Sequence, residues 1–201
     1  LSQGYNYAMK REDVEIAVAQ NQTDFDGMMV VRRQVFVDEQ NIPENQEFDG
    51  NDFGATHILA KIGGKVIGTM RVRYFSDFVK FERMAVLKPY RKSDVSDKIM
   101  NKGFEFVARK GYQKVYGVCK KELLPRWKEC GYEPIAGAPV LQHNGMSLIP
   151  IMRELPKDPK ALTIKSHPEL LTAKEDTWDS IALPQDRLIM LAASVKAKFS
   201  K

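Results

Sequence analysis

The sequence is poor in cysteine and in long apolar runs, and each absence excludes a class of protein. Cys119 and Cys130 are the only cysteines among 201 residues, and neither belongs to a CxxC or Cys/His cluster. We therefore expect no disulfide framework and no metal site. No apolar stretch approaches the roughly 20 residues needed to cross a bilayer. No secretory signal opens the chain, so we expect a cytoplasmic protein with reduced cysteines.

Charge of one sign is not concentrated anywhere in the chain. The formal net charge is +5, but the basic residues occur in short groups such as "RR" at 32–33, "KPYRK" at 88–92 and "KK" at 120–121. Nucleic-acid-binding proteins usually cluster their basic residues in a patch or stripe, so nucleic acid is not an expected partner. The length and the 43% of hydrophobic residues suit one domain with an appendage.

Hydrophobic periodicity predicts a mixed order of strands and helices. The expected elements are a strand at 15–19, a helix from Asp24 or Asp26 to about residue 40, a hairpin at 55–75 turning at Gly63 and Gly64, a strand at 78–87, a helix at about 94–110, a strand at 114–119, a helix at about 121–130 ended by Gly131, and a strand at 146–155. Residues 78–119 then form a βαβ unit, which implies parallel strands with a right-handed crossover. Pro150 interrupts the last strand, which is therefore expected at a sheet edge or with a bulge.

The chain divides into three parts. We expect a tail at 1–13, a main domain at 14–155 and an extension at 156–201 that begins with "PKDPK". The extension ends with apolar residues at helical spacing, namely Leu188, Leu191, Ala192, Val195 and Phe199. An amphipathic helix packed on the core is expected there, with a lid, a packing arm or a dimer contact as alternatives.

The sequence motifs, as well as the order of the expected elements, resemble those of the GNAT superfamily of N-acyltransferases. "VRRQVFVDEQNIPENQEFDGNDFGATHILA" at 31–60 resembles the ElaA-like branch, which reads R-x-x-V-F-V-x-E-Q, then E-x-D-x-x-D and A-x-H. "GKVIGTMRVR" at 64–73 and "FERMAVLKPYR" at 81–91 fit the same branch. The resemblance covers about 14–155 and implies an α/β (α+β) fold, with a mixed central sheet and a parallel βαβ core.

The resemblance also implies transfer of an acyl group from an acyl thioester, usually acetyl-CoA or another acyl-CoA, to a small-molecule amine. The backbone of Met84, Ala85 and Val86 would pair with the extended pantetheine arm of the donor. The pyrophosphate would lie at the N-terminus of the following helix, where unpaired N–H groups favour anions. The residues implied there are Arg91, Lys92, Ser93, Asp94, Val95 and Ser96.

Two positions depart from the family pattern. The phosphate loop of the family reads Q/R-x-x-G-x-G/A, but Asp94 and Ser96 stand at the glycine positions. Ser93 or Asp94 is expected to cap the helix, taking N–H groups that a pyrophosphate needs, and an acidic cap repels an anion. Trp127 stands where the family often has a tyrosine that protonates the departing thiolate. An indole N–H lacks that acidity, so Trp127 is expected to pack against the acyl chain or the core.

Glu82, in "FERMAV", is the candidate general base that removes a proton from the amine. Its apolar neighbours Phe81 and Met84 are expected to raise its pKa, which suits that role. A structural ion pair with Arg83, Arg71 or Arg73 is the alternative.

The segment before the hairpin supplies the candidate acceptor site. Its candidate substrate-binding residues, together with one from the hairpin, are Arg32, Phe36, Glu47, Asp49 and Arg71. Arg32 and Phe36 lie one helical turn apart and would face the acceptor; the alternative is a surface arginine and a core phenylalanine. The acidic residues, Asp52 included, would grip a cationic acceptor or order the long loop through arginines. His57 is expected to be a hydrogen-bonded sheet residue.

Three functions compete on this evidence. The first is an acyl-CoA-dependent N-acyltransferase of the ElaA-like type. The second takes its acyl group from an acyl-carrier protein, as in acyl-homoserine-lactone and N-acyl amino acid synthases, which share the fold and lack the glycine loop. The third is a catalytically silent module that binds a partner or ligand. Besides the amine, the partners considered are an acyl-carrier protein and a second copy of the chain in a homodimer.

Overall fold

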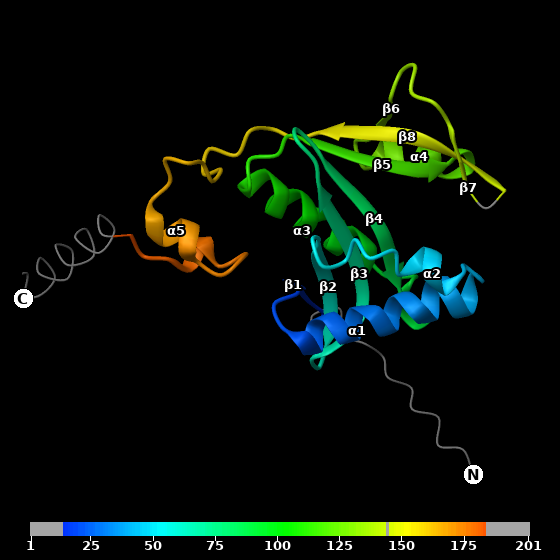
Figure 1. The fold of residues 1–201 in the computed structure, drawn as a ribbon, viewed down its shortest axis with the longest axis horizontal. Helices are drawn as coiled ribbons and strands as arrows, with labels where there is room; N and C mark the ends of the chain where they lie inside the picture. Colours follow the sequence, from blue (N-terminus) through cyan, green and yellow to red (C-terminus); the bar gives the residue numbers. More distant parts are fainter. Residues whose placement is uncertain (1–13, 144, 184–201) are drawn as a thin grey trace, which may run out of the picture.

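The computed structural model describes residues 14–143 and 145–183, which form one mixed sheet of eight strands (Figure 1). The strands are β1 Glu15–Val18, β2 Thr56–Ile62, β3 Lys65–Tyr74, β4 Val79–Val86, β5 Lys114–Lys120, β6 Glu133–Pro134, β7 Leu141–His143 and β8 Met146–Glu154. Their order is β1-β2-β3-β4-β5-β8-β6, and β7 also pairs with β8. Only β4 and β5 pair in parallel among these strands. The mixed fold expected from the sequence is confirmed.

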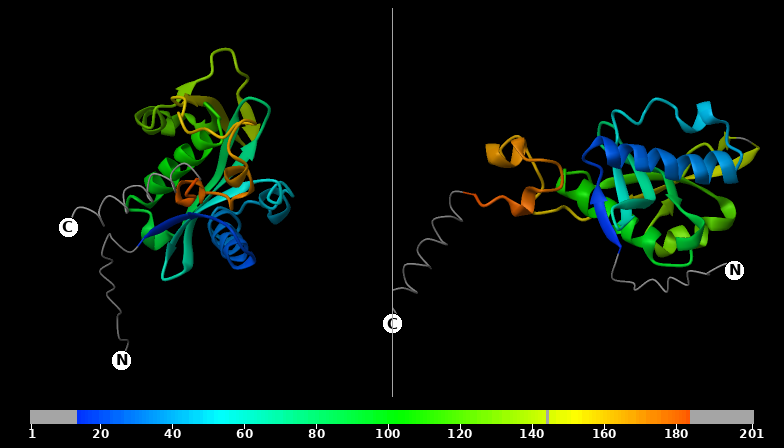
Figure 2. Two further views of the ribbon diagram at one scale, coloured as in Figure 1. Left: turned by 90° about the vertical axis from the view of Figure 1, so that its left-hand side faces the viewer. Right: turned by 90° about the horizontal axis from the view of Figure 1, so that it is seen from below.

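Helices cover both faces of the sheet. The α-helices are α1 Gln22–Arg32, α2 Glu44–Glu47, α3 Val95–Arg109, α4 Leu124–Glu129 and α5 Pro168–Thr172, and a π-helical segment at Arg33–Glu39 continues α1. α1 packs on β2, β3 and β4 from one side, and α3 packs on the same strands from the other (Figure 2). The main core lies on the α3 side, whereas Val31, Val35 and Ala85 form a smaller cluster beneath α1. None of the described helices is both long and apolar enough to cross a membrane.

The first helix has Asn21 as its N-cap, and Asp24, one of the two aspartates expected near the cap, lies in its first turn. The Asn21 side chain accepts a hydrogen bond from the backbone N–H of Asp24 (2.9 Å), which satisfies a first-turn donor. The Asp24 carboxylate instead accepts from the backbone N–H of Gln20 (3.0 Å) and pairs with Lys61. The expected position of Asp24 near the cap is therefore confirmed, while asparagine, which caps a helix as well as aspartate does, occupies the N-cap itself.

Glycine ends two elements, as the sequence predicts. Gly63 and Gly64 have φ angles of +54° and +77° and connect β2 to β3 in a two-residue turn, the kind that hairpins favour. Gly131, with a φ of +78°, follows α4 and its C-cap residue Cys130. A side chain would strain the backbone at these positions, so the glycines fix where the elements stop.

β4, α3 and β5 form the predicted βαβ unit, and its two strands diverge along their length (Figure 1). Parallel pairing joins only Val79 with Val115 and Lys80 with Tyr116. Beyond Lys80, the backbone groups of β4 that face β5 make no pairing with that strand. One side of the β4 backbone is therefore left open to another partner.

β8 lies inside the sheet, although Pro150 predicted an edge or bulged strand. It pairs with β5 on one side and with β6 and β7 on the other. The carbonyl of Pro150 accepts from the backbone N–H of Ile135 (3.0 Å), and a strand residue points its nitrogen and oxygen to the same side. On that side β6 ends at Pro134. Proline has no backbone N–H, and at Pro150 this missing donor would point to a place where β6 has already ended. The missing donor therefore costs the sheet no hydrogen bond, and the expectation of an edge strand is wrong.

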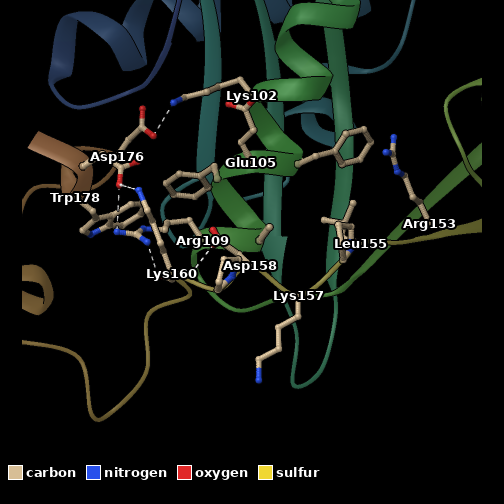
Figure 3. Close-up of a pocket in the computed structure, with 16 residues that line it drawn as sticks. Lys102, Glu105, Arg109, Arg153, Leu155, Lys157, Asp158, Lys160, Asp176 and Trp178 are labelled. Atoms are coloured by element: carbon tan, nitrogen blue, oxygen red, sulfur yellow. Dashed lines mark hydrogen bonds and ion pairs between the residues drawn. The ribbon is translucent and has the colours of Figure 1, made fainter.

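Residues 156–183 form an arm that packs on α3. Trp178 is 5% exposed and stacks on Phe106 of α3, with ring centroids 5.5 Å apart. Lys102 of α3 pairs with Asp176 of the arm at 2.7 Å. Together with the end of β8, the arm and α3 surround a cavity of about 570 Å³ (Figure 3). The packing arm is thus the alternative that these residues adopt, and the predicted amphipathic helix of the extension lies outside the described residues.

We predict that Trp178→Ala frees the arm without unfolding the domain. Removing a buried tryptophan side chain destabilises by about 3–5 kcal/mol, and Trp178 is the one buried residue of the segment 156–183, whose other contacts lie nearer the surface. Limited proteolysis should cleave the variant within residues 156–183 much faster than the wild type, with the circular dichroism of the remaining domain unchanged. Leu171→Ala, at an exposed position of the same arm, is the control. Equal cleavage of both variants would contradict this role for Trp178.

Candidate active site

A β-bulge in β4 sets the geometry of the candidate site. β3 and β4 pair Thr69 with Ala85 but Arg71 with Glu82, so β4 carries one extra residue in this interval. Arg83 has a φ of +54°, a left-handed conformation that is uncommon for a residue with a side chain. Bulges bend and twist the strand that carries them. The bulge therefore accounts for the divergence of β4 from β5.

A cavity of about 120 Å³ lies between the diverging strands. Its walls come from the sheet, α3 and the segment around α4. They are formed by Met70, Phe81, Glu82, Arg83, Met84, Met100, Gly117, Val118, Trp127, Tyr132 and Ile151. The lining is apolar except at the bulge, where Glu82 and Arg83 contribute the charged groups. Three residues predicted from the sequence, Glu82, Met84 and Trp127, therefore meet at one cavity.

Trp127 packs against the inner wall of this cavity. Its ring lies edge-on to Tyr132, with centroids 5.2 Å apart and an interplanar angle of 86°. Tyr132 is buried, and its hydroxyl lies 4.0 Å from the sulfur of Met100. Burial raises the pKa of Tyr132 well above its usual value, so the phenol stays protonated at neutral pH. The structure thus gives Trp127 the packing position that the sequence predicted.

Beside the cavity, Arg71 holds three carboxylates together. Its Nε and Nη2 donate to Oε1 of Glu82 at 2.9 and 2.7 Å, and its Nη1 donates to Asp52 at 2.9 Å. Asp49 accepts from both Nη1 and Nη2, at 2.7 and 2.8 Å. His57 of β2 is a hydrogen-bonded sheet residue, as expected, with Nε2 3.1 Å from the carbonyl oxygen of Asp52. The loop before β2 is therefore fixed to both β3 and β4.

Arg32 and Arg83 complete this network. Arg32 is fully buried, with Nε 2.5 Å from Oε1 of Glu47, Nη1 paired with Asp52, and Nη2 donating to the Glu47 carbonyl at 2.9 Å. Arg83 reaches the same carboxylate from the bulge, with Nε 2.8 Å from Oε2 of Glu47. The acidic residues are thus held by arginines, which is the loop-ordering alternative that the sequence left open.

Glu82 does not have the raised pKa expected from its apolar neighbours. Burial raises the pKa of Glu82, but the hydrogen bond and charge of Lys80 (Nζ–Oε2 2.6 Å) and the charge of Arg71 outweigh that effect. The pKa of the carboxyl therefore lies below its usual value. The expectation is wrong because adjacent strand residues point to opposite faces, so Phe81 faces the core near α3 and Glu82 faces the ion pairs.

The predicted acceptor residues differ in their access to a ligand. Arg32, Glu47 and Arg71 are each at most 1% exposed, so their burial argues against direct contact with an acceptor. Phe36 is partly buried and packs on the cluster beneath α1, which is the core alternative. The Asp49 side chain keeps 26% of its surface exposed. We conclude that the buried members of this set position the site rather than line it.

The N-terminus of α3 is less capped than the sequence predicted. Asp94 makes no side-chain hydrogen bond to the helix, and its carboxylate instead pairs with the lysine one turn further on at 3.4 Å. Ser93 accepts only a long hydrogen bond, 3.4 Å, from the N–H of Val95. Within the described part of the chain, no side chain accepts from the N–H groups of Ser96 or Asp97. The expected carboxylate cap is wrong, and these donors are available to an anion.

Arg91 and Lys92 flank this helix start in different states. The Nε of Arg91 donates to the carbonyl of Val86 at 2.7 Å, and its Nη2 pairs with Glu39 at 2.6 Å. Arg91 therefore links the end of β4 to the π-helical segment. Lys92 is exposed and extends the basic surface of the turn.

Several residues of the site were missed from the sequence. Met100 and Tyr132 line the cavity, and Lys80 lies beside the Glu82 carboxylate at 2.6 Å. The alternation of β4 could have found Lys80, which is two residues from Glu82 and so shares its face. Met100 and Tyr132 reach the cavity through packing and strand register, which carry no local signal in the sequence. Arg73, one of the arginines that the sequence offered as an ion-pair partner of Glu82, lies 3.8 Å from its carboxylate.

Comparison with known proteins agrees with this geometry. A model of the "Acetyltransferase (GNAT) family" matches residues 25–132, more than half of the chain. An uncharacterized N-acetyltransferase of Bacillus subtilis, YjcF, is 31% identical over 137 residues, which are 64% of this chain and 97% of YjcF.

Solved structures share the fold at lower identity. ElaA of Escherichia coli has a TM-score of 0.62 and 23% identity, covering 70% of this chain and 99% of ElaA. The CoA-dependent acyl-homoserine lactone synthase BjaI, solved with SAM and isopentyl-CoA, has a TM-score of 0.60 and 17% identity. It covers 72% of this chain and 84% of BjaI.

The ion-pair network predicts how the stability of the fold depends on pH. Burial raises the pKa of Asp52, but its bonds to Arg32 and Arg71 outweigh this and lower it below the usual value. Its contribution to stability is therefore complete above about pH 5 and is lost as the pH falls below the unfolded-state pKa of about 4.

We predict that Asp52→Asn lowers the free energy of unfolding by about 3–5 kcal/mol at pH 7, because two buried guanidinium groups lose a charged partner. The difference in the free energy of unfolding between wild type and variant, measured by urea titration, should decrease as the pH is lowered toward 3. Asp77→Asn, at an exposed ion pair, should leave the unfolding midpoint at pH 7 unchanged. A gap for Asp52→Asn that is constant with pH would contradict the role assigned to its charge.

Proposed function

The chain belongs to the acetyltransferase (GNAT) family, and we propose that it transfers a short acyl group from an acyl thioester such as acetyl-CoA to an amine. The observation that carries the proposal is the cavity between the diverging strands β4 and β5, with Glu82 at its charged end. The open side of the β4 backbone at Met84, Ala85 and Val86 would pair with the pantetheine arm, with the Val86 carbonyl already accepting one hydrogen bond from Arg91.

The size of the cavity supports a short acyl chain. Its volume of about 120 Å³ is well below the roughly 300–1,000 Å³ of pockets that hold drug-sized ligands. An acetyl group fits this space, and the chain of a long fatty acid does not. The walls of the cavity include Met100, Trp127 and Tyr132, and Tyr132 contacts each of the other two. This argues for acetyl-CoA over a long-chain donor on an acyl-carrier protein.

The start of α3 supports a donor that carries a pyrophosphate. The N–H groups of Ser96 and Asp97 and the positive end of the helix dipole favour an anion there, and Lys92 adds charge. Asp94 opposes this binding through its own negative charge, since its side chain is about half exposed near the same turn. We therefore assign the CoA pyrophosphate to this turn, at lower affinity than a glycine loop would give.

The proposed reaction is a direct transfer. The amine nitrogen attacks the thioester carbonyl carbon, a C–N bond forms, and the C–S bond breaks. The proton lost by the amine passes to the ionised Glu82 carboxylate, directly or through a water molecule. The departing thiolate takes a proton from solvent, because Trp127 has no acidic proton and the raised pKa of Tyr132 makes its phenol a weaker acid.

We predict that acetyl-CoA raises the melting temperature of the protein and that free thiol appears when an amine is added. A ligand that binds only the native state stabilises it by mass action. CoA, acetyl-CoA, a long-chain acyl-CoA and an acyl-carrier protein should be compared in the same thermal-shift screen.

Glu82→Gln should slow turnover by roughly 10² or more with little change in acetyl-CoA affinity. If only the acyl-carrier protein raised the melting temperature, the acyl donor would be an acyl-carrier protein and not an acyl-CoA. Binding without turnover on any amine would favour a silent binding module.

We further predict that Asp94→Asn tightens CoA binding about two- to fivefold at low ionic strength, because a like charge near the helix N-terminus is removed. Isothermal titration calorimetry at two salt concentrations checks this, since added salt should reduce the gain. Asp77→Asn makes the same change of net charge at a distant exposed site and should leave the affinity unaltered. If Asp94→Asn bound CoA more weakly than the wild type, the assignment of the pyrophosphate to this turn would be wrong.

A further inference from the structure

The sheet face that carries Glu82 stays accessible next to β5. The β5 residues that face α3 are buried, whereas Tyr116 and Val118, which point the other way, are partly exposed. Lys80 pairs with Tyr116 and so shares this accessible face. A ligand can therefore approach Glu82 across the side chains of β4 and β5, from the face opposite α3.

Arg73 is a cation on this face without a hydrogen bond to its guanidinium group among the described residues. It pairs with Lys80 across β3 and β4, which places it on the same face as Glu82. Its Nη1 lies 3.8 Å from Oε1 of Glu82, which is too long for a hydrogen bond. The guanidinium packs over the ring of Phe75, 5.4 Å from its centroid, and 29% of the side chain is exposed. Its N–H donors are thus available to a ligand.

The charges around Glu82 do not balance. The cations are Arg32, Arg71, Arg73, Lys80 and Arg83, and the carboxylates are Glu47, Asp49, Asp52 and Glu82. Five positive charges against four negative leave an excess of one, and His57 adds none because burial lowers its pKa. Arg32 and Arg71 are fully engaged by hydrogen bonds, and Arg83 pairs with both Glu47 and Asp49, so we assign the excess to the accessible pair of Arg73 and Lys80.

We propose that Arg73 and Lys80 bind an anionic group of the acceptor, so that the substrate is an amine that also carries a carboxylate or a phosphate. This inference rests on the proposed function and adds the substrate class to it. The planar fork of Arg73 matches a carboxylate or phosphate in two parallel hydrogen bonds, and the ammonium of Lys80 adds a point charge.

The distances set the spacing of the two groups on the acceptor. Arg73 and Lys80 lie 3.8 and 2.6 Å from the two oxygens of the Glu82 carboxylate. An acceptor with its amine on Glu82 and its anion on Arg73 therefore carries these two groups close together, and an α-amino acid and 2-aminoethyl phosphate are two compounds with such short spacing. The partly exposed Tyr116 and Val118 leave an apolar surface for the rest of the acceptor.

The test compares matched acceptors that differ only in the anion. Steady-state kinetics with acetyl-CoA should use α-amino acids against their carboxamides, and 2-aminoethyl phosphate against ethanolamine. We expect the wild type to prefer the anionic member of at least one pair by about tenfold or more in kcat/KM, the factor that a hydrogen bond to a charged group gives. The two pairs distinguish a carboxylate from a phosphate.

Variants assign the preference to Arg73. Arg73→Gln should bring the ratio of anionic to neutral acceptor toward one by raising KM for the anionic member, and Arg73→Lys should keep part of it. Lys165→Gln, an equal change of net charge on the exposed arm, should keep the wild-type ratio. Melting temperatures of all variants show whether each is folded.

The outcomes separate this inference from the function on which it rests. The inference is overturned if neutral amines are acylated as well as their anionic counterparts, or if Arg73→Gln does not change the preference for the anion. In both cases the proposed acyltransferase function still holds. If no amine is acylated, the proposed function fails, and calorimetry with the same matched pairs then decides on the anion site. Binding of the anionic members that is lost in Arg73→Gln upholds the site, and equal binding of both members overturns it.

Discussion

The contact on which the rest of the site depends is the buried guanidinium of Arg71 with three carboxylates. Asp49 and Asp52 come from the loop before β2, and Glu82 comes from β4 next to the bulge. Arg71 is nearly inaccessible to solvent, so loss of one partner would leave a buried charge uncompensated. The hydrogen bonds therefore fix a long polar loop against the sheet at the place where β4 turns away from β5. In the described part of the chain, Arg71 is the one residue whose ion pairs tie the loop and Glu82 to each other, while Arg32 and Arg83 hold the loop and Lys80 holds Glu82 separately.

The same contact relates the parts of the proposed reaction to one another. Together with Lys80, it keeps Glu82 ionised at the charged end of an apolar cavity, while the bulge at Arg83 leaves the β4 backbone open to an extended ligand. The N–H groups at the start of α3 lie beyond the end of that strand, in the order in which a CoA thioester would meet them. A buried ion-pair network stabilises a fold less than its number of contacts suggests, because each charge loses its hydration. Its contribution here is to the geometry of the site.

Much of the fold follows from local chemistry that a sequence displays. Gly63, Gly64 and Gly131 predict their turns because only glycine adopts positive φ without strain, and the βαβ unit follows from periodicity. The corrections arise where a distant partner decides. Pro150 sits inside the sheet because a neighbouring strand has ended beside it, and Glu82 has a lowered pKa because strand register brings Lys80 and Arg71 to it. The positive φ of Arg83 has no signature in its own side chain.

The central claim is that an acyl thioester occupies the space between β4 and β5 and the start of α3. Hydrogen–deuterium exchange measured by mass spectrometry, with and without saturating acetyl-CoA, tests this claim most directly. The account predicts slower exchange confined to residues 82–87 and 93–98, the open strand edge and the first turn of the helix. Slower exchange at residues 102–109 and 155–160 around the arm cavity, with none in β4, would contradict it.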